Sequence, residues 1–486
     1  MCKEPMTERE FDLLLETSLP EAPPSDVTKW VNPWRRSMDR ILVGFAFQGI
    51  TLHFLLLQYI LPAIGSVLLL LGFRSLRKEN LWFRVCYGIA MFNLAQTMVV
   101  LIANGTIYSG AVSQFLLGYT IPLLGVDLCQ YLFFWLGFRA VRKKAGLAPG
   151  AASAFALLVW NAIICWLGLL EVGNMPLLIG GIILLLYICI LRCLWTLSTQ
   201  LDEAGYAVRA APVRVEDHLL VKLLAAVLAV GLIVGYAFFD RYPMEWTPAV
   251  ETGQHQAIRD HLVELGMPAQ VAEDLTAEDL LACEGATEVL VDQRTHPFRE
   301  GGTTEVGSGQ EELQITGVAL RLEEDTWKII HHFQWVVDPG FRGTEAIQFW
   351  PAYRQGEGWA CENGWTGQVL CDRDGQTYTA PYYFLEEETY SGQDWFMGEY
   401  TATDVFAEFS LPEEGENHRG YAAYDIKELR EGWAVDSWSN YYHQTSKIQY
   451  PVQTAKEGRG DWSGRVVRDI QDALQFSVIE GTAELW

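Results

Sequence analysis

An uninterrupted apolar run over residues 219–239, closed by Asp240, constrains this chain more than any other feature. At a rise of about 1.5 Å per residue, about 20 helical residues cross the roughly 30 Å hydrocarbon core of a bilayer. The one charged residue of the run, Lys222, lies near its start, where a long side chain reaches the headgroups. The run therefore predicts a membrane-spanning helix, with the membrane lipid bilayer as its partner.

The charge of the chain changes across this helix. Up to and including Asp240 there are 18 Lys and Arg against 16 Asp and Glu; from Arg241 onward there are 17 against 44, a net charge of −27. An apolar module therefore precedes the helix and an acidic, water-soluble module follows it. Because phosphate contacts require Lys and Arg, this charge argues against nucleic acid and anionic lipid as partners of the soluble module.

Other apolar stretches precede the last span. The stretch 41–73 is too long for one crossing, so we expect either two short helices that meet near residues 58–62 or a re-entrant pair. The remaining spans are predicted at about 83–103, 113–138, 151–170, 177–197 and 219–239. Residues 41–240 therefore predict a multi-pass α-helical membrane bundle of about seven spans, built from helical hairpins.

Basic residues predict the orientation of the bundle. All 18 Lys and Arg before Asp240 fall in the segments 1–40, 74–84, 139–144 and 192–222. Clustered basic residues stay on the cytoplasmic side of a membrane. We therefore expect a plasma membrane protein of bacterial type, with a cytoplasmic N-terminal tail over 1–40 and an extracytoplasmic C-terminal half.

The soluble half begins with helical signals and continues with strands. Residues 241–286 predict a helical neck, in which Thr276 has the spacing of a helix N-cap. Residues 287–486 hold about ten short strands punctuated by Gly and Pro, including a hairpin of 313–322 with 327–335. This pattern favours a mainly antiparallel β-sandwich of jelly-roll type.

Two local patterns complete this half. Asp374-Gly375 predicts a tight hairpin turn rather than a calcium loop, because the loop is far shorter than 12 residues. An amphipathic helix is expected near the C-terminus, with Val466, Val467, Ile470 and Leu474 on one stripe.

Cysteine and histidine positions predict neither a metal site nor a cofactor. The nine cysteines form no CxxC pair and no zinc-ligand spacing with histidine. A bridge between Cys361 and Cys371 is left open. His331 and His332 are adjacent on a predicted strand, where side chains alternate between faces, so the two cannot share a metal without a bulge.

Aromatic residues supply the candidate ligand-binding positions. The soluble half holds 11 of the 18 tryptophans. Sandwich cores bury most aromatic side chains, and we expect a few to line a groove and stack on a sugar ring or a peptide. The candidates are Trp350, Tyr353, Trp359, Trp365, Tyr390 and Trp395.

Polar residues within the bundle are few. Asp127 lies in the middle of a predicted span and His53 lies in the first apolar stretch. A carboxylate at that depth either marks an ion or proton path or is a structural hydrogen-bonding group.

The chain has no GxSxG, HExxH, phosphate-loop or dinucleotide motif, so the sequence names no reaction. The favoured function is a sensor or scaffold whose outward β domain binds an envelope glycan or protein ligand. Two other functions stay open: a transporter with Asp127 as the coupling group, and an extracytoplasmic enzyme that acts on glycans through a pair of carboxylates.

Overall fold

The computed structural model describes residues 33–486 except 51–53, 171–176, 205–207, 209–210, 250–252, 254, 299–310, 324, 351–357, 362–363, 395–397, 431 and 461–465. The chain divides into two compact units. The first comprises Met1–Ile102 with Ala111–Leu232, and the second Ala103–Gly110 with Ile233–Trp486. Most of the predicted N-terminal tail lies outside the described residues.

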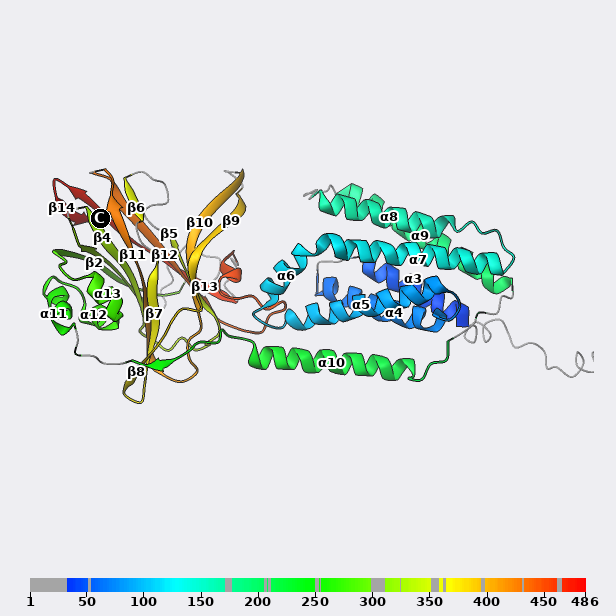
Figure 1. The fold of residues 1–486 in the computed structure, drawn as a ribbon, viewed down its shortest axis with the longest axis horizontal. Coiled ribbons are helices and arrows are strands. Elements are labelled where there is room, and N and C mark those ends of the chain that lie inside the picture. The colour runs from blue at the N-terminus through cyan, green and yellow to red at the C-terminus, as the bar shows by residue number, and fades with distance from the viewer. Residues whose placement is uncertain are drawn as a thin grey trace, which may run out of the picture. The chain divides into compact units, whose positions relative to one another are not determined.

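The N-terminal half is helical, as predicted (Figure 1). Its helices are α3 (Pro33–Gly49), α4 (Leu57–Leu76), α5 (Leu81–Ala103), α6 (Ser109–Gly118), α7 (Thr120–Lys144), α8 (Ala152–Leu169), α9 (Leu177–Glu203) and α10 (Asp217–Phe238). Within the described residues, six helices are long and apolar enough to cross a membrane, namely α4, α5, α7, α8, α9 and α10. With 17 residues, α3 falls short of that length, so the described helices support six spans rather than the predicted seven.

The connection between α3 and α4 lies earlier in the chain than the predicted position near residues 58–62. Because α4 begins at Leu57, the segment 58–62 belongs to this helix and Pro62 lies in its second turn. A proline at this position lacks the N–H that would bond to the carbonyl of Gln58, and the helix continues past it with that one hydrogen bond missing. Sequence pattern therefore placed the break at the proline, whereas the helix begins before it.

Small residues hold α3 and α4 together. A Cβ atom added to Gly72 would lie 2.5 Å from Cγ1 of Ile41, so only glycine permits this approach of the two helices. Aromatic side chains then fill the centre of the unit: Trp34, Phe45, Phe73, Phe83, Phe134 and Phe138 are fully buried there.

Three short helices open the second unit. They are α11 (Gln256–Glu264), α12 (Ala269–Asp274) and α13 (Ala277–Ala282), preceded by the two-residue strand β1 (Thr247–Pro248). The predicted cap is confirmed, because Oγ1 of Thr276 accepts a 3.1 Å hydrogen bond from the backbone N–H of Asp279.

The rest of this unit consists of antiparallel strands, which confirms a mainly antiparallel β domain. They are β2 (Glu288–His296), β3 (Leu313–Arg321), β4 (Thr326–Trp335), β5 (Glu345–Trp350), β6 (Trp359–Cys361), β7 (Thr366–Arg373), β8 (Gln376–Ala380), β9 (Phe384–Asp394), β10 (Gly398–Phe409), β11 (Glu416–Glu428), β12 (Ala434–Gln444), β13 (Val467–Ile479) and β14 (Thr482–Leu485). A 3₁₀ turn, η2 (Glu457–Gly460), precedes β13.

The strands form two sheets that share one core. Sheet A has the order β1-β8-β7-β11-β4-β3-β2, with β6 also paired to β11, and sheet B has the order β14-β13-β12-β5-β10-β9. The expected hairpins β3–β4 and β7–β8 are present, the second with Asp374 and Gly375 at φ values of 51° and 76° in its turn. The finer prediction of a jelly roll stays a prediction.

The predicted C-terminal helix is wrong, since Val467, Ile470 and Leu474 lie in strand β13 and Val466 directly precedes it. Ile470, Leu474, Phe476 and Val478 are all buried at the period of two that a strand requires. The position between the first two is Asp472, which is also buried and bonded to His296 at 3.0 Å. Because Asp472 interrupts the apolar alternation, the sequence pattern resembled that of an amphipathic helix.

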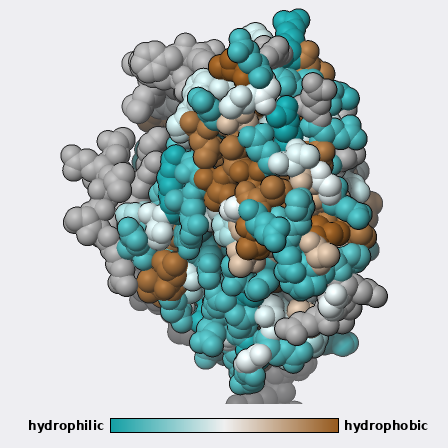
Figure 2. Space-filling view, turned by 90° about the vertical axis from the view of Figure 1, so that its left-hand side faces the viewer, coloured by the Kyte–Doolittle hydropathy of each residue, from teal (hydrophilic) through white to brown (hydrophobic). Residues whose placement is uncertain are grey.

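The space between the sheets is closely packed. Phe333 of sheet A and Phe349, Phe409 and Tyr441 of sheet B belong to one buried cluster. A cavity beside His331 measures about 10 Å³, which is about the volume that one water molecule needs. Figure 2 shows a largely hydrophilic surface around a hydrophobic patch on one side of this domain, as expected of an acidic, water-soluble fold.

Candidate ligand-binding site

Two tryptophans lie side by side on the outer face of sheet B. Trp350 on β5 and Trp438 on β12 are register partners, with ring centroids 6.3 Å apart and an interplanar angle of 52°. Phe349 and Tyr441 point into the core, so alternation places the two tryptophans on the opposite face. Both are partly exposed. They are called the tryptophan pair below.

A buried carboxylate fixes the surroundings of the pair. Oδ2 of Asp404 on β10 accepts hydrogen bonds from Nε1 of Trp350 at 2.9 Å, from Nε2 of Gln348 at 2.5 Å and from the hydroxyl of Tyr390 at 2.5 Å. Oε1 of Gln348 in turn accepts a 2.9 Å bond from the Tyr442 hydroxyl. These hydrogen bonds fix the orientations of Trp350, Tyr390 and Tyr442.

Basic side chains cover the neighbouring part of this face. Nζ of Lys456 lies 2.9 Å from Oε1 of Glu408 and 4.7 Å from the centroid of the Phe406 ring. The guanidinium of Arg459, on η2, lies 4.9 Å from the Tyr390 ring centroid. The segment 454–460 thus closes one part of the face, and the tryptophan pair lies in the part that stays accessible.

The structure brings two of the six predicted aromatic residues, Trp350 and Tyr390, into this cluster. Trp359 is 2% exposed, and its Nε1 donates to the backbone oxygen of Trp433 at 3.0 Å. Trp365 packs between Phe349 and Tyr424, so it belongs to the core. Tyr353 and Trp395 lie outside the described residues.

The second aromatic of the pair, Trp438, was missed by sequence reasoning. It lies on β12, where buried positions alternate with more exposed ones. Val435, Ser437 and Ser439 are the buried residues on either side of it. That alternation was the available signal, but the pairing with Trp350 depends on the long-range register between β12 and β5.

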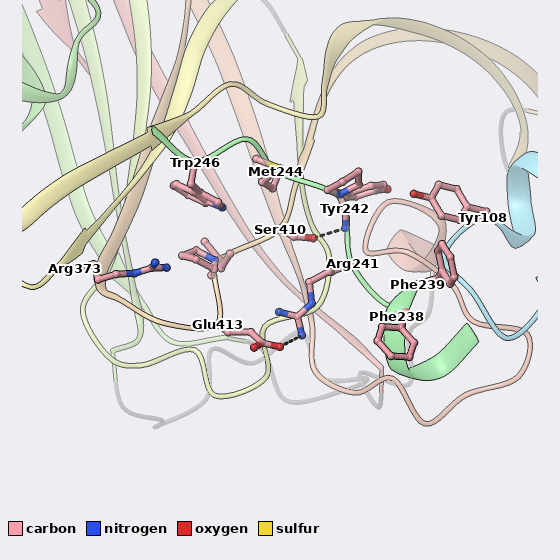
Figure 3. A pocket seen from close by; sticks show the side chains of 13 residues that line it. Tyr108, Phe238, Phe239, Arg241, Tyr242, Met244, Trp246, Arg373, Ser410 and Glu413 are labelled. Carbon is pink, nitrogen blue, oxygen red and sulfur yellow. Dashed lines mark hydrogen bonds and ion pairs between the residues drawn. The ribbon is translucent and has the colours of Figure 1, made fainter. Parts of the chain in front are cut away.

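A pocket of about 510 Å³ lies elsewhere in the same unit (Figure 3). It is called the α10 pocket, because it begins at the C-terminal end of that helix. Its lining consists of Tyr108, Phe238, Phe239, Arg241, Tyr242, Pro243, Met244, Trp246, Arg373, Ser410, Leu411, Pro412 and Glu413.

Tyr242 holds the wall of this pocket in place. Its backbone N–H donates to Oγ of Ser410 at 2.9 Å, its ring stacks on Tyr383 at 4.4 Å, and its hydroxyl donates to the carboxylate of Glu408. Burial raises the pKa of the Tyr242 hydroxyl, and the nearby Glu408 raises it further. Burial also raises the pKa of Tyr108. Both phenols therefore stay neutral at physiological pH.

None of the predicted candidates lines the α10 pocket. The run of aromatic residues just after the last span was a local signal for part of it, since such residues gather at membrane interfaces. Nothing in the sequence connects this run with Arg373, because that residue lies on β7 and reaches the pocket only through the fold.

The intramembrane candidate Asp127 lies on α7 and is hydrogen-bonded to a neighbouring helix. Its Oδ1 accepts a 2.8 Å bond from Nδ2 of Asn93 on α5, which also donates to Oε1 of Gln130 at 3.1 Å. Asp127 is exposed on the surface of its unit. His53 lies outside the described residues.

The adjacent histidines face opposite sides of sheet A, as strand alternation requires. His331 lies 2.7 Å from Oγ of Ser437 on sheet B, whereas His332 lies 2.8 Å from Oδ2 of Asp274 on α12. Within the part of the chain that the structure describes, no group of three His, Cys, Asp or Glu side chains could hold a metal ion.

Cys361 and Cys371 are not bonded to each other. Cys361 is in register with Ile426 on β11, while Leu370, the neighbour of Cys371, is in register with Arg419 on the same strand. At about 3.3 Å per residue the two cysteines lie about 26 Å apart along β11, far beyond the reach of a disulfide.

Comparisons with known proteins give no name to the chain. No family model and no curated protein matches it. Among solved structures, one described as "Pore forming protein" has 6% identity and a TM-score of 0.18, and the match covers 41% of this chain and 95% of that one. Another, described as "AvmM Catalyzes Macrocyclization in Alchivemycin A Biosynthesis", has 11% identity and a TM-score of 0.18, with coverage of 41% and 92%. At such TM-scores neither likeness carries an argument about function.

Proposed function

We propose that this protein is a membrane-anchored glycan-binding protein of the cell envelope, with its β domain outside the plasma membrane as a sensor or scaffold module. In this proposal α3 and α4 form the first hairpin, which gives seven spans. The segregation of basic residues supports the orientation.

The observation that carries this proposal is the tryptophan pair. Partly exposed indole rings present flat apolar faces, on which the C–H face of a sugar ring stacks. Buried polar side chains lie beside them, namely Gln348, Asn440 and Asp404, and Asp404 orients Trp350 by a 2.9 Å hydrogen bond. A few polar groups beside aromatic surfaces are typical of binding sites for small polar ligands.

The same geometry disfavours the glycan-active enzyme. Asp404 is 1% exposed, and its Oδ2 accepts three hydrogen bonds. A carboxylate held in this way orients its donors, whereas glycoside hydrolysis needs carboxyl groups that reach the substrate.

A glycan array tests the proposal. Full-length protein in detergent micelles is applied to immobilised bacterial envelope polysaccharides, and the bound fraction is measured for wild type, Trp350→Ala and Trp438→Ala. We expect each substitution to lower affinity about fivefold, since one aromatic stacking contact contributes about 1 kcal/mol.

Trp486→Ala is the matched control, because that tryptophan is 70% exposed and lies outside the pair. Equal loss of binding in all three variants, or no glycan bound by wild type, would contradict the proposal.

A second function, transport, is favoured by one specific observation. Polar side chains connect several helices: Gln48 donates to Ser66 at 3.2 Å, Ser66 lies 3.4 Å from Thr97, and Thr97 donates to the backbone oxygen of Asn93. Asn93 reaches Asp127. Such a chain of polar groups in a membrane bundle is a functional candidate.

Asp127→Asn separates this function from the first, with Asp127→Glu as the charge-preserving variant. The variant is expressed in a deletion strain, and uptake and efflux are measured. If Asp127→Asn complements every phenotype as fully as wild type does, the proposal of transport through Asp127 is contradicted.

A further inference from the structure

The α10 pocket combines an aromatic part with an arginine part. Figure 3 shows Phe238, Phe239 and Tyr108 together, and Arg373 apart from them beside Trp246. The rings of Tyr108 and Phe239 form an edge-to-face contact at 6.3 Å. The pocket is therefore amphipathic along its length.

The position in the chain places the aromatic part at the membrane surface. Phe238 is the last residue of α10 and is 74% exposed, and Phe239 follows it. A helix long and apolar enough to cross a membrane thus ends directly in exposed aromatic rings. Aromatic residues in that position lie at the level of lipid headgroups, so the pocket opens where acyl chains meet headgroups.

Arginines outnumber carboxylates in the lining of the pocket, in a half that carries a net charge of −27. Arg241 and Arg373 line it with Glu413, and Nη1 of Arg373 also lies 4.0 Å from Oε2 of Glu414, whose side chain is 81% exposed. Nε of Arg373 is buried and has no hydrogen-bond partner among the described residues. A buried donor in this state favours an acceptor supplied from outside.

Arg241 already has a partner that a ligand could replace. Its Nε lies 3.4 Å from Oδ1 of Asp240, which is buried, and its Nη2 lies 2.8 Å from Oε1 of Glu413, whose side chain is 74% exposed. Exposed ion pairs contribute little to stability. A phosphate can therefore replace this carboxylate and accept two hydrogen bonds from the guanidinium.

We propose that the α10 pocket binds the phosphate headgroup of an anionic membrane lipid, with Arg241 and Arg373 on the phosphate and the lipid chains along Phe238 and Phe239. The pocket volume of about 510 Å³ accommodates a headgroup. The net charge of the whole domain argues against anionic lipid, but this pocket is a local exception. The proposal does not depend on glycan binding or on the orientation of the bundle.

Native mass spectrometry tests the proposal. Full-length protein in detergent is mixed with phosphatidylglycerol or with phosphatidylcholine of the same chains, and the occupancy of bound lipid is measured. We expect wild type to retain phosphatidylglycerol preferentially, and Arg241→Gln with Arg373→Gln together to lower that affinity at least about tenfold, as loss of charge-assisted hydrogen bonds predicts.

Two further variants make the test specific. Glu413→Gln removes the competing carboxylate, so we expect it to raise phosphatidylglycerol affinity severalfold, a gain that a misfolded variant would not show. Arg430→Gln alters an exposed arginine outside the pocket and should change nothing. Equal retention of both lipids, or no effect of the arginine substitutions, overturns the proposal. Displacement of the lipid by millimolar inorganic phosphate alone would also overturn it, since the site would then be one for free anions.

Discussion

The indole Nε1 of Trp350 donates a 2.9 Å hydrogen bond to Oδ2 of Asp404, a carboxylate with 1% of its surface exposed. The tryptophan that stacks on the proposed ligand is thus oriented by a group that the ligand does not reach. Asp404 also accepts hydrogen bonds from Gln348 and Tyr390, so one buried residue positions several others.

Asp404→Asn should weaken glycan binding about tenfold without changing any exposed group. The amide oxygen can take the place of Oδ2, but the three donors then bond to a neutral acceptor, and a hydrogen bond to a charged group contributes about 1.5–3 kcal/mol against about 1 kcal/mol for a neutral one. Glycan affinity and thermal unfolding of the full-length protein check this. Asp374→Asn, at an exposed carboxylate in the turn between β7 and β8, is the control and should leave both unchanged.

Asp274→Asn should detach the neck helices from sheet A. Asp274 is 2% exposed and holds both His332 at 2.8 Å and Nε of Arg419 at 2.9 Å. Breaking a buried ion pair costs about 3–5 kcal/mol. Denaturant unfolding followed by near-ultraviolet circular dichroism should show this loss. Asp260→Asn, on the exposed face of α11, should be neutral.

The β domain should lose stability on mild acidification, in part through His331. Burial lowers the pKa of His331 to about 4, whereas the unfolded chain titrates near 6.5. The contribution of this neutral histidine is thus full above about pH 6.5 and is lost as pH falls toward 4, at up to about 1.4 kcal/mol per pH unit.

His331→Gln isolates this contribution. Hydrogen exchange of the β4 amides in full-length protein, corrected for intrinsic rates, should fall in protection between pH 6.5 and 4.5 more steeply for wild type than for the variant. Equal pH slopes would mean that His331 does not stay neutral in the fold.

Reporter fusions should place the C-terminal half and the basic segments of the bundle on opposite sides of the membrane. A secreted phosphatase fused after Trp486 should be active, and a fluorescent protein at the same position should be dark. Fusions after Lys144, in a basic segment, should show the reverse pattern. A fluorescent fusion at residue 486 would refute the proposed orientation.

Local chemistry explains which elements were predictable. Thr276 caps α13 and Asp374-Gly375 turns a hairpin because each of these structures depends on residues only a few positions apart. The membrane helices were predictable for the same reason, since a span is a continuous run. The break before α4 was misplaced because Pro62 is tolerated within the helix.

Long-range pairing explains what was not predictable. Strand β13 was read as a helix because Asp472 occupies an inward position, and its partner His296 lies on β2. The tryptophan pair exists only because β5 and β12 are neighbours in sheet B. Arg373 reaches the α10 pocket from β7. In each case the decisive contact joins residues that the sequence keeps far apart.

Hydroxyl-radical footprinting of Trp350 and Trp438 tests the central claim most directly. Full-length protein is oxidised with and without a saturating bound polysaccharide, and the modification of each tryptophan is measured by mass spectrometry. We expect protection of both residues of the pair and unchanged modification of Trp486, which is exposed and lies outside the pair. Bound polysaccharide with no protection of either Trp350 or Trp438 would contradict it.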